Sequence, residues 1–188
     1  MEAWKESLET RRMPPREATY DILTTPPASR EKILDAIASQ AFISLEVYGN
    51  CCRSTLWAIQ THLRCMEAAP LRASAVLAGG IAGTGETCGA VLGGLLAIGE
   101  VMATDDLTDQ EQYAVANATA KQFVDRITSQ YGSTRCHLIQ EAIMGWCCDD
   151  PSKARAWQDA GGPTACAGVC ATAARLAASL LLDREAKL

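Results

Sequence analysis

Apolar residues recur with helical spacing along most of this chain. In residues 29–47, Ile33, Ile37 and Ala41 lie four positions apart, as they do on one face of an α-helix. Ser29 is suited to cap the start of this run, and the residues Tyr-Gly-Asn at 48–50 end it. Similar spacing and boundary residues predict further helices over 51–66, 71–78, 87–103, 110–131, 133–144, 151–160 and 164–187.

The distribution of polar residues indicates one helical domain. Residues 87–103 are almost all apolar, and a helix that is apolar on every side lies in the middle of a core. No stretch alternates apolar and polar residues for long enough to predict a β-strand. We therefore expect an all-α, single-domain bundle of about seven helices over residues 29–188. Residues 1–28 contain four prolines and are expected to form an arm with at most a short helix at 16–23.

Composition and charge narrow the range of partners. The chain has 188 residues, of which 48% are apolar and 21% charged, with a net charge of −5. Negative charge disfavours nucleic acid and anionic membranes, and only 5% of the residues are aromatic. Residues 73–99 carry Glu86 as their only charge, but they are rich in Ala and Gly, so we expect a buried helix, loop and helix there.

Cysteine content points toward sulfur chemistry. Residues 1–16 are charged and polar without an apolar stretch, so no signal peptide is expected and a cytoplasmic location is predicted. Nine cysteines in such a chain are metal ligands or redox thiols more often than a framework of disulfides, and an odd number cannot all pair internally.

Four cysteines share a local pattern of a glycine, a residue suited to capping a helix, and then the cysteine. The side chains of Asn, Ser and Thr accept hydrogen bonds from the free amides of a first helical turn. Each sulfur is therefore expected at a helix N-terminus, where the helix dipole stabilises a thiolate near neutral pH. The four are Cys51, Cys88, Cys136 and Cys166.

The strongest of the four segments is the glycine-rich stretch 79–94. Its glycines allow the backbone to approach a cofactor closely, and Gly85 and Gly89 flank Cys88 as candidate cofactor-binding positions. Gly89 and Gly93 share a helical face and permit intimate contact with another helix, which makes a homodimer one of our predictions. Glycines packed for tightness alone are the simpler alternative. The loop also resembles a P-loop, but Glu86 stands where a lysine is needed, which argues against nucleotide binding.

Spacing rules out the usual local metal motifs, because neither a C-x-x-C nor a ferredoxin-type run occurs. A metal site would have to be assembled by convergence of four helix starts. Four thiolates suit zinc or an iron–sulfur cluster. The alternative is that these cysteines are ordinary small residues of the core.

The same four blocks resemble a known family. They are Asn50-Cys51 at a helix start, the Gly-rich loop through Cys88-Gly89-Ala90, Tyr131-Gly132-Ser133 with Cys136, and Cys166 before an Ala-rich run. This order is similar to that of the bacterial and archaeal redox-active proteins named for a C, GCAxxG, C, C cysteine pattern. The resemblance covers about residues 37–182 and implies a helical redox protein. A related domain of split-Soret cytochromes is associated with an iron–sulfur centre, which implies such a cluster here.

The other cysteines are expected to have different roles. Cys52 points about 100° away from Cys51 around a helix and is predicted to pack in the core, with a ligand role as the alternative. Cys170 lies one turn after Cys166 and is a candidate reserve ligand or resolving thiol. Cys65 is predicted to be structural. The adjacent Cys147 and Cys148 are expected to be free surface thiols rather than a strained vicinal disulfide.

Three other side chains near cysteines are weaker candidates. His62 lies three residues before Cys65, and His137 follows Cys136, so either could in principle complete a mixed metal site. A lone histidine is more often solvated or hydrogen-bonded. Glu86 could gate protonation of the site, or it could simply be a carboxylate favoured near a helix N-terminus.

These observations lead to three hypotheses. The first is a cytoplasmic redox protein in which Cys51, Cys88, Cys136 and Cys166 hold an iron–sulfur cluster for electron transfer. The second is a metal-free dithiol oxidoreductase that pairs Cys88 with Cys166 or Cys51. The third is a structural zinc protein with the same four ligands. An electron carrier and a redox enzyme fit the sequence alike, with a redox protein or a small electron donor or acceptor as partner.

Overall fold

The computed structural model describes residues 27–63 and 68–185, and within these ranges the chain is helical without a strand. The all-α prediction is confirmed. The helices are α2 (Pro27–Tyr48), α3 (Cys51–Leu63), α4 (Ala68–Ala73), η1 (Ser74–Leu77), α5 (Gly89–Met102), α6 (Gln110–Tyr131), α7 (Cys136–Met144), η2 (Pro151–Lys153), α8 (Ala154–Asp159) and α9 (Gly162–Glu185).

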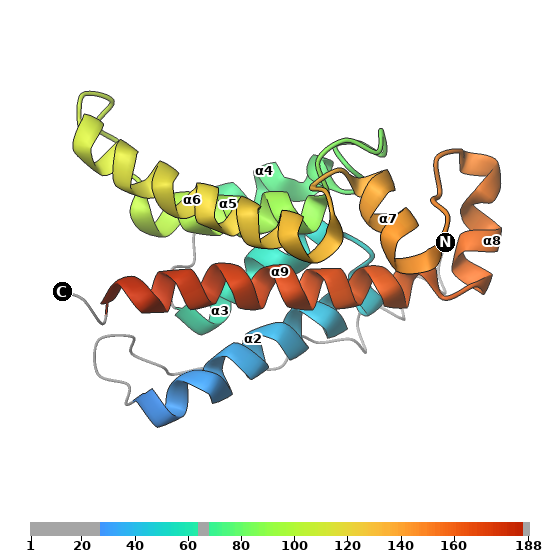
Figure 1. The fold of residues 1–188 in the computed structure, drawn as a ribbon, viewed down its shortest axis with the longest axis horizontal. Coiled ribbons are helices and arrows are strands. Elements are labelled where there is room, and N and C mark those ends of the chain that lie inside the picture. The colour runs from blue at the N-terminus through green and yellow to red at the C-terminus, as the bar shows by residue number, and fades with distance from the viewer. Residues whose placement is uncertain (1–26, 64–67, 186–188) are drawn as a thin grey trace.

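Helix α9 forms the central axis of the molecule. Figure 1 shows it running lengthwise between α2 and α6, and it also packs against α3 and α5. Its buried face is made largely of alanines, which carry no long side chain and so let neighbouring helices approach closely. Ala173, Ala174, Ala177 and Ala178 are all fully buried. The small-residue composition of the C-terminal helix therefore explains how several helices can surround it.

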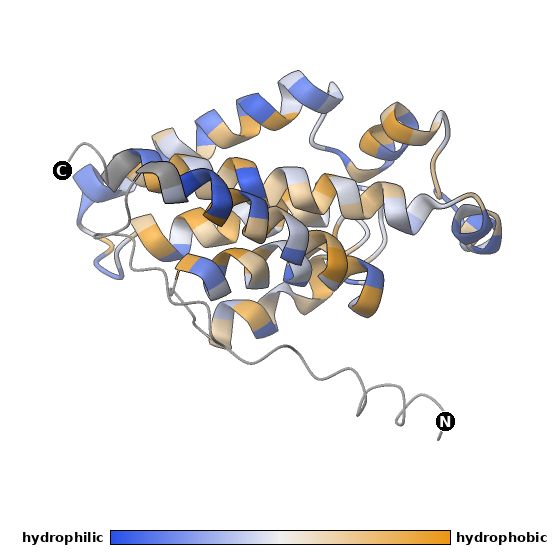
Figure 2. Ribbon diagram, turned by 90° about the horizontal axis from the view of Figure 1, so that it is seen from below, coloured by the Kyte–Doolittle hydropathy of each residue, from blue (hydrophilic) through white to orange (hydrophobic). Residues whose placement is uncertain are grey.

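The same helix has the length and composition of a membrane-spanning segment over Gly162–Asp183, the only such helix among the described residues. Half of its most apolar window is buried inside the protein. Figure 2 shows hydrophobic turns along the inner helices, whereas α8 at the right-hand end is mostly hydrophilic. Burial of this kind is typical of the central helix of a folded domain.

Helix α5 occupies the interior, as its apolar sequence predicts. Its glycines allow close packing on two sides. A Cβ at Gly93 would lie 2.5 Å from the Cys52 carbonyl oxygen on α3, and one at Gly94 would lie 2.5 Å from the ring of Phe123 on α6. The glycine face of α5 is therefore covered by α3 of the same chain. That face is not free for a second copy, so a homodimer stays a prediction without this basis.

Several helix ends differ from the prediction. Helix α9 begins at Gly162, two residues early, because Pro163 is tolerated in a first turn where its missing amide would be unpaired anyway. Helix α2 is described from Pro27 onward. The helix expected at 71–78 is instead the pair α4 and η1, and the one expected at 151–160 is the pair η2 and α8. Residues 1–26, including the expected helix at 16–23, and Cys65 lie outside the described residues, and the division at residue 28 stays a prediction.

Candidate functional site

The four predicted cysteines line one cavity. Cys51, Cys88, Cys136 and Cys166 come from the starts of α3, α5 and α7 and from α9, and their side chains border a space of about 280 Å³. Cys88 and Cys136 are buried, and Cys51 and Cys166 are half-buried. We call this space the cysteine cavity. Residues as far apart as 115 positions, from 51 to 166, are thus gathered by the packing of helices around α9.

A short backbone bridge holds Cys88 and Cys136 together. Thr87 and Arg135 form an isolated antiparallel β-bridge, and the amide of each following cysteine donates across it. The Cys88 amide bonds the Thr134 carbonyl at 2.8 Å, and the Cys136 amide bonds the Glu86 carbonyl at 2.6 Å. The side chain of Cys136 interacts with the Cys88 thiol and raises its pKa. This pair is therefore fixed by main-chain geometry rather than by side-chain packing alone.

Cys51 is placed by a helix cap and a glycine. Asn50 Oδ1 accepts a hydrogen bond of 3.1 Å from the Arg53 amide, as the predicted N-cap should. Asn50 Nδ2 donates to the Ala75 carbonyl at 2.9 Å, which ties the cap to η1. A Cβ at Gly89 would overlap the Cys51 sulfur. Gly89 is therefore needed for space beside the Cys51 thiol, although it is not among the residues that line the cavity.

Cys88 and Cys166 do not have the expected helix positions. Cys88 is itself the N-cap residue of α5, and Thr87, which the sequence suggested as the cap, belongs to the β-bridge. Cys166 is the fifth residue of α9, because that helix starts at Gly162, so its sulfur belongs to the second turn. The pattern of glycine, cap and cysteine therefore describes the site at Cys51 well and the site at Cys166 poorly.

The thiols are less acidic than the sequence suggests. Burial, followed by the nearby Cys88, raises the pKa of Cys51 to about 11. Burial also raises the pKa of Cys166 to about 12. The hydrogen bond with Cys136, followed by burial, raises the pKa of Cys88 well above its ordinary value. Backbone amides at the starts of α3 and α5 act in the opposite direction but are outweighed. The prediction of thiolates near neutral pH is therefore wrong for these three thiols as the fold places them.

Trp157 and Gln140 are among the further lining residues that the sequence did not single out. Trp157 of α8 is 7% exposed, lines the cavity, and makes an edge-to-face contact with Trp146 at 5.2 Å between ring centroids. Gln140 lies one turn after Cys136 and its Nε2 points to the Cys136 sulfur at 3.6 Å. Trp157 could have been recognised as the single tryptophan of the polar segment 151–160. Gln140 could have been recognised from its position four residues after Cys136 on the same helix.

Comparison with known proteins gives one match. A family model described as "Putative redox-active protein (C_GCAxxG_C_C)" matches residues 49–180. The chain belongs to this family. The matched range begins beside Cys51 and extends past Cys166, so it contains the whole cysteine cavity. No curated protein and no solved structure matches the chain.

The glycine-rich loop of this C_GCAxxG_C_C protein is held in an unusual backbone conformation. Residues 79–83 all have positive φ, and two of them, Ile81 and Ala82, are not glycines. Such residues cost free energy in the left-handed region, and strain of this kind often accompanies functional sites. Gly79 lines the cavity, and a Cβ at Gly80 would lie 2.7 Å from the Cys136 Cβ. The loop therefore needs glycine where it presses against the cysteines.

Gly85 and Glu86 are not part of the lining of the cysteine cavity. A Cβ at Gly85 would overlap the His137 ring, and the Gly85 carbonyl accepts the His137 amide at 3.3 Å. Glu86 forms an exposed ion pair of 2.9 Å with Arg135. Neither residue is among those that line the cavity. The packing of His137 accounts for Gly85, and the cross-bridge ion pair accounts for Glu86.

Cys52 and Cys170 are buried in helix interfaces. Both are 0% exposed, and neither is among the residues that line the cavity. The prediction that Cys52 packs in the core is confirmed. The Cys170 thiol donates to the Cys51 carbonyl oxygen at 3.7 Å, which joins α9 to the first turn of α3. Cys170 thus supports the position of Cys51 from behind.

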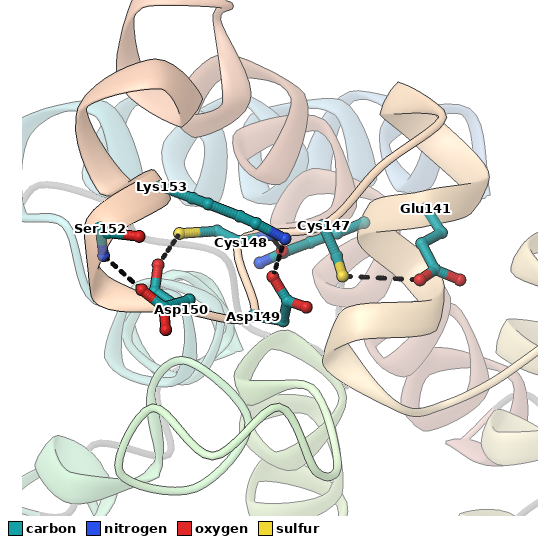
Figure 3. A network of polar contacts seen from close by, with 8 residues as sticks. Glu141, Cys147, Cys148, Asp149, Asp150, Ser152 and Lys153 are labelled. Carbon is teal, nitrogen blue, oxygen red and sulfur yellow. Dashed lines mark hydrogen bonds and ion pairs between the residues drawn. The ribbon is translucent and has the colours of Figure 1, made fainter.

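Cys147 and Cys148 are free and half-buried rather than fully exposed. Figure 3 shows their side chains pointing to different neighbours. The Cys147 thiol lies 3.5 Å from Glu141 Oε1, and the Cys148 thiol lies 3.8 Å from the Asp150 carbonyl oxygen. The Cys148 amide donates to Gln140 Oε1 at 2.8 Å. The same glutamine therefore contacts Cys136 in the cavity and fixes the backbone of this outer pair.

His62 and His137 both contact neighbouring residues of the fold. His62 is buried and its Nε2 lies 2.6 Å from Gln40 Oε1, so it is hydrogen-bonded as a lone histidine usually is. His137 covers Gly85. Over the described residues, no group of three or more His, Cys, Asp and Glu side chains is arranged to hold a metal ion as it stands.

Proposed function

We propose that this redox-active family member holds an iron–sulfur cluster in the cysteine cavity through Cys51, Cys88, Cys136 and Cys166. The observation that carries the proposal is the convergence of four thiols from four segments on one space of about 280 Å³. Thiolates are the usual ligands of such clusters. A cavity between the sulfurs suits a group of several atoms, whereas a single zinc ion draws four sulfurs to within about 2.3 Å of one centre.

The lining of the cavity supports such a role. When bound, the cluster would supply one-electron oxidation and reduction. Trp157, Ile139 and Val169 are buried and add apolar surface to the lining of the site. Gln140 Nε2 points to the Cys136 sulfur, and backbone amides of Gly79 and Cys52 stabilise negative charge on the Cys51 sulfur. Hydrogen bonds to ligand sulfurs and exclusion of solvent are the means by which a protein sets a reduction potential.

The raised pKa values of the thiols are compatible with ligation. A metal-bound thiol is deprotonated, because the cation compensates the buried negative charge. The same burial slows a metal-free dithiol reaction, in which a thiolate must attack. Together these effects favour a thiol that ionises when the cluster assembles over one that attacks a disulfide.

A second candidate function rests on the contact between Cys88 and Cys136. The Cys136 side chain has the largest effect on the pKa of the Cys88 thiol, and main-chain hydrogen bonds join the two segments, so these two are the candidates for a dithiol pair. Oxidation of the pair to a disulfide would release two protons and two electrons to an electron acceptor.

Structural zinc is the third candidate. In all three cases we place the protein in the cytoplasm, with a redox protein or a small electron carrier as partner for the first two.

Analysis of the anaerobically purified full chain separates these candidates. The proposal predicts broad visible absorption together with stoichiometric iron and acid-labile sulfide. A colourless protein that contains zinc would instead support the structural metal. A colourless protein free of metal, which loses two free thiols on mild oxidation, would support the dithiol.

A further inference from the structure

A second cavity lies behind the wall that carries Cys51. Its volume is about 290 Å³, and it is lined by Ser44 and Tyr48 of α2, Asn50, Arg53, Ser54 and Trp57 of α3, and Leu71 of α4. We call it the aromatic cavity. Sites for small molecules are usually concave, mostly apolar and equipped with a few polar groups, and this cavity has that composition at the small end of the usual size range.

The two cavities share one short segment of chain. Within residues 44–51, positions 44, 48 and 50 line the aromatic cavity, and positions 45, 49 and 51 line the cysteine cavity. The last turn of α2 and the cap of α3 therefore separate the two spaces. Asn50 fixes the backbone of this wall, because both the oxygen and the nitrogen of its side-chain amide are hydrogen-bonded to backbone groups.

The chemistry of the aromatic cavity selects a class of ligand. Tyr48 and half-buried Trp57 offer ring faces for stacking, and Leu71 adds an apolar side chain. Arg53 is exposed, and its guanidinium has no ion-pair or hydrogen-bond partner among the residues that the structure describes. No acidic side chain is among the described residues that line the cavity. A guanidinium binds carboxylates through paired hydrogen bonds.

We propose that the aromatic cavity binds a small planar aromatic carboxylate, with its ring between Tyr48 and Trp57 and its carboxylate on Arg53. The volume admits one or two fused rings. A ligand there lies one wall away from Cys51, which suits a small electron donor or acceptor. That redox role rests on the proposed function, whereas binding itself does not.

Calorimetric titration of the full chain with 2-naphthoate tests the proposal. The matched probe is 2-naphthalenemethanol, which has the same rings without the charge. We expect 2-naphthoate to bind at least about tenfold more tightly than the alcohol, since a charge-assisted hydrogen bond is worth roughly that factor or more. Equal affinity of the two probes, or no binding of 2-naphthoate at about 1 mM, would overturn the proposal.

Two variants locate the binding site. Arg53→Gln should weaken 2-naphthoate binding by about tenfold or more. Arg72→Gln is the matched control, because Arg72 is also exposed but does not line the cavity, and it should bind as the unmodified chain does. Trp57→Leu should also weaken binding. Unchanged affinity in Arg53→Gln would place the ligand elsewhere and contradict the proposal.

Binding of 2-naphthoate and uptake of iron are separate measurements, so each proposal can fail without the other. Binding is measured both before and after anaerobic reconstitution with iron and sulfide. A chain that binds 2-naphthoate but takes up no iron would leave this proposal standing and remove the cluster. A chain that takes up iron and sulfide but does not bind 2-naphthoate would do the reverse.

Discussion

Two sets of cysteines in this protein differ in the space that their side chains border. Cys52 and Cys170 are 0% exposed, whereas Cys51 and Cys166 are only half-buried. Yet the less buried pair lines the cysteine cavity and the more buried pair fills helix interfaces. Burial therefore does not distinguish the thiols that line the cavity from those that do not. What distinguishes the cavity set is that side chains from separate helices point at a common space.

Adjacent residues make the contrast clearest. Cys51 and Cys52 follow each other in α3, and successive helical positions point about 100° apart. Cys51 consequently faces the cavity, and Cys52 lies against α5, where its carbonyl would touch any side chain placed at Gly93. One residue of register decides which of two chemically identical thiols borders the cysteine cavity.

The largest effect is expected from removing one cavity thiol. Cys88→Ser should lower iron and sulfide content after anaerobic reconstitution to near zero, because Cys88 is central to the set and its hydroxyl replacement is a poor ligand. Metal analysis of the folded variant measures this, with circular dichroism to verify its helix content. Full iron content in the folded variant would remove Cys88 from the site.

A pair of glycine substitutions in α5 tests the space around Cys51. Gly89→Ala should destabilise the protein by about 2 kcal/mol or more and reduce iron uptake, since the new Cβ would overlap the Cys51 sulfur. Gly99→Ala in the same helix meets no atom within 4 Å and should stabilise it by up to about 1 kcal/mol. Urea unfolding measures both. Similar stabilities for the two variants would contradict the packing of Gly89 on Cys51.

Truncating a buried thiol outside the cavity should separate stability from metal binding. Cys170→Ala should cost about 1–2 kcal/mol of unfolding free energy, because it leaves a small void at a fully buried position. Its iron content after reconstitution should stay within error of the unmodified chain. Loss of iron from a variant that remains folded would show that Cys170 belongs with the cavity set.

The smallest effect is expected at the outer pair. Cys147→Ser should change stability by less than about 0.5 kcal/mol, because this half-buried thiol makes one weak contact with Glu141. Iron uptake should be unaffected. The measurement is the same urea titration and metal analysis, and a large fall in either quantity would mean that the outer pair is coupled to the cavity through Gln140.

Sequence patterns predicted the helices and the identity of the cavity cysteines better than they predicted the chemistry around them. Helical spacing locates α6 at its observed bounds, since both ends carry strong signals, Asp109 as cap and Gly132 as stop. Ligand roles for the four cysteines stay a prediction. Their acidity was misjudged because burial, which depends on the packing of the whole chain, outweighs the local helix amides.

Other features depend on contacts that no local pattern encodes. The β-bridge between Thr87 and Arg135 joins two loops that are distant in sequence, and it positions Cys88 and Cys136. Trp157 closes the cavity from a short helix that reads as polar surface. Gly85 is suggested by sequence as a cofactor contact, yet its neighbour is His137. Each of these depends on which segments meet in three dimensions.

Alkylation of individual thiols shows whether the four cavity cysteines bind one group together. Iodoacetamide is applied to the full chain before and after anaerobic reconstitution with iron and sulfide, and peptide mass spectrometry reports the modification of each cysteine. We predict that the half-buried Cys51 and Cys166, which react in the metal-free chain, become protected together and are released together when the metal is chelated. The buried Cys88 and Cys136 should stay unreactive at full iron content, and Cys147 should react alike in both states. Continued reactivity of any one of the four at full iron content would contradict a single site shared by all of them.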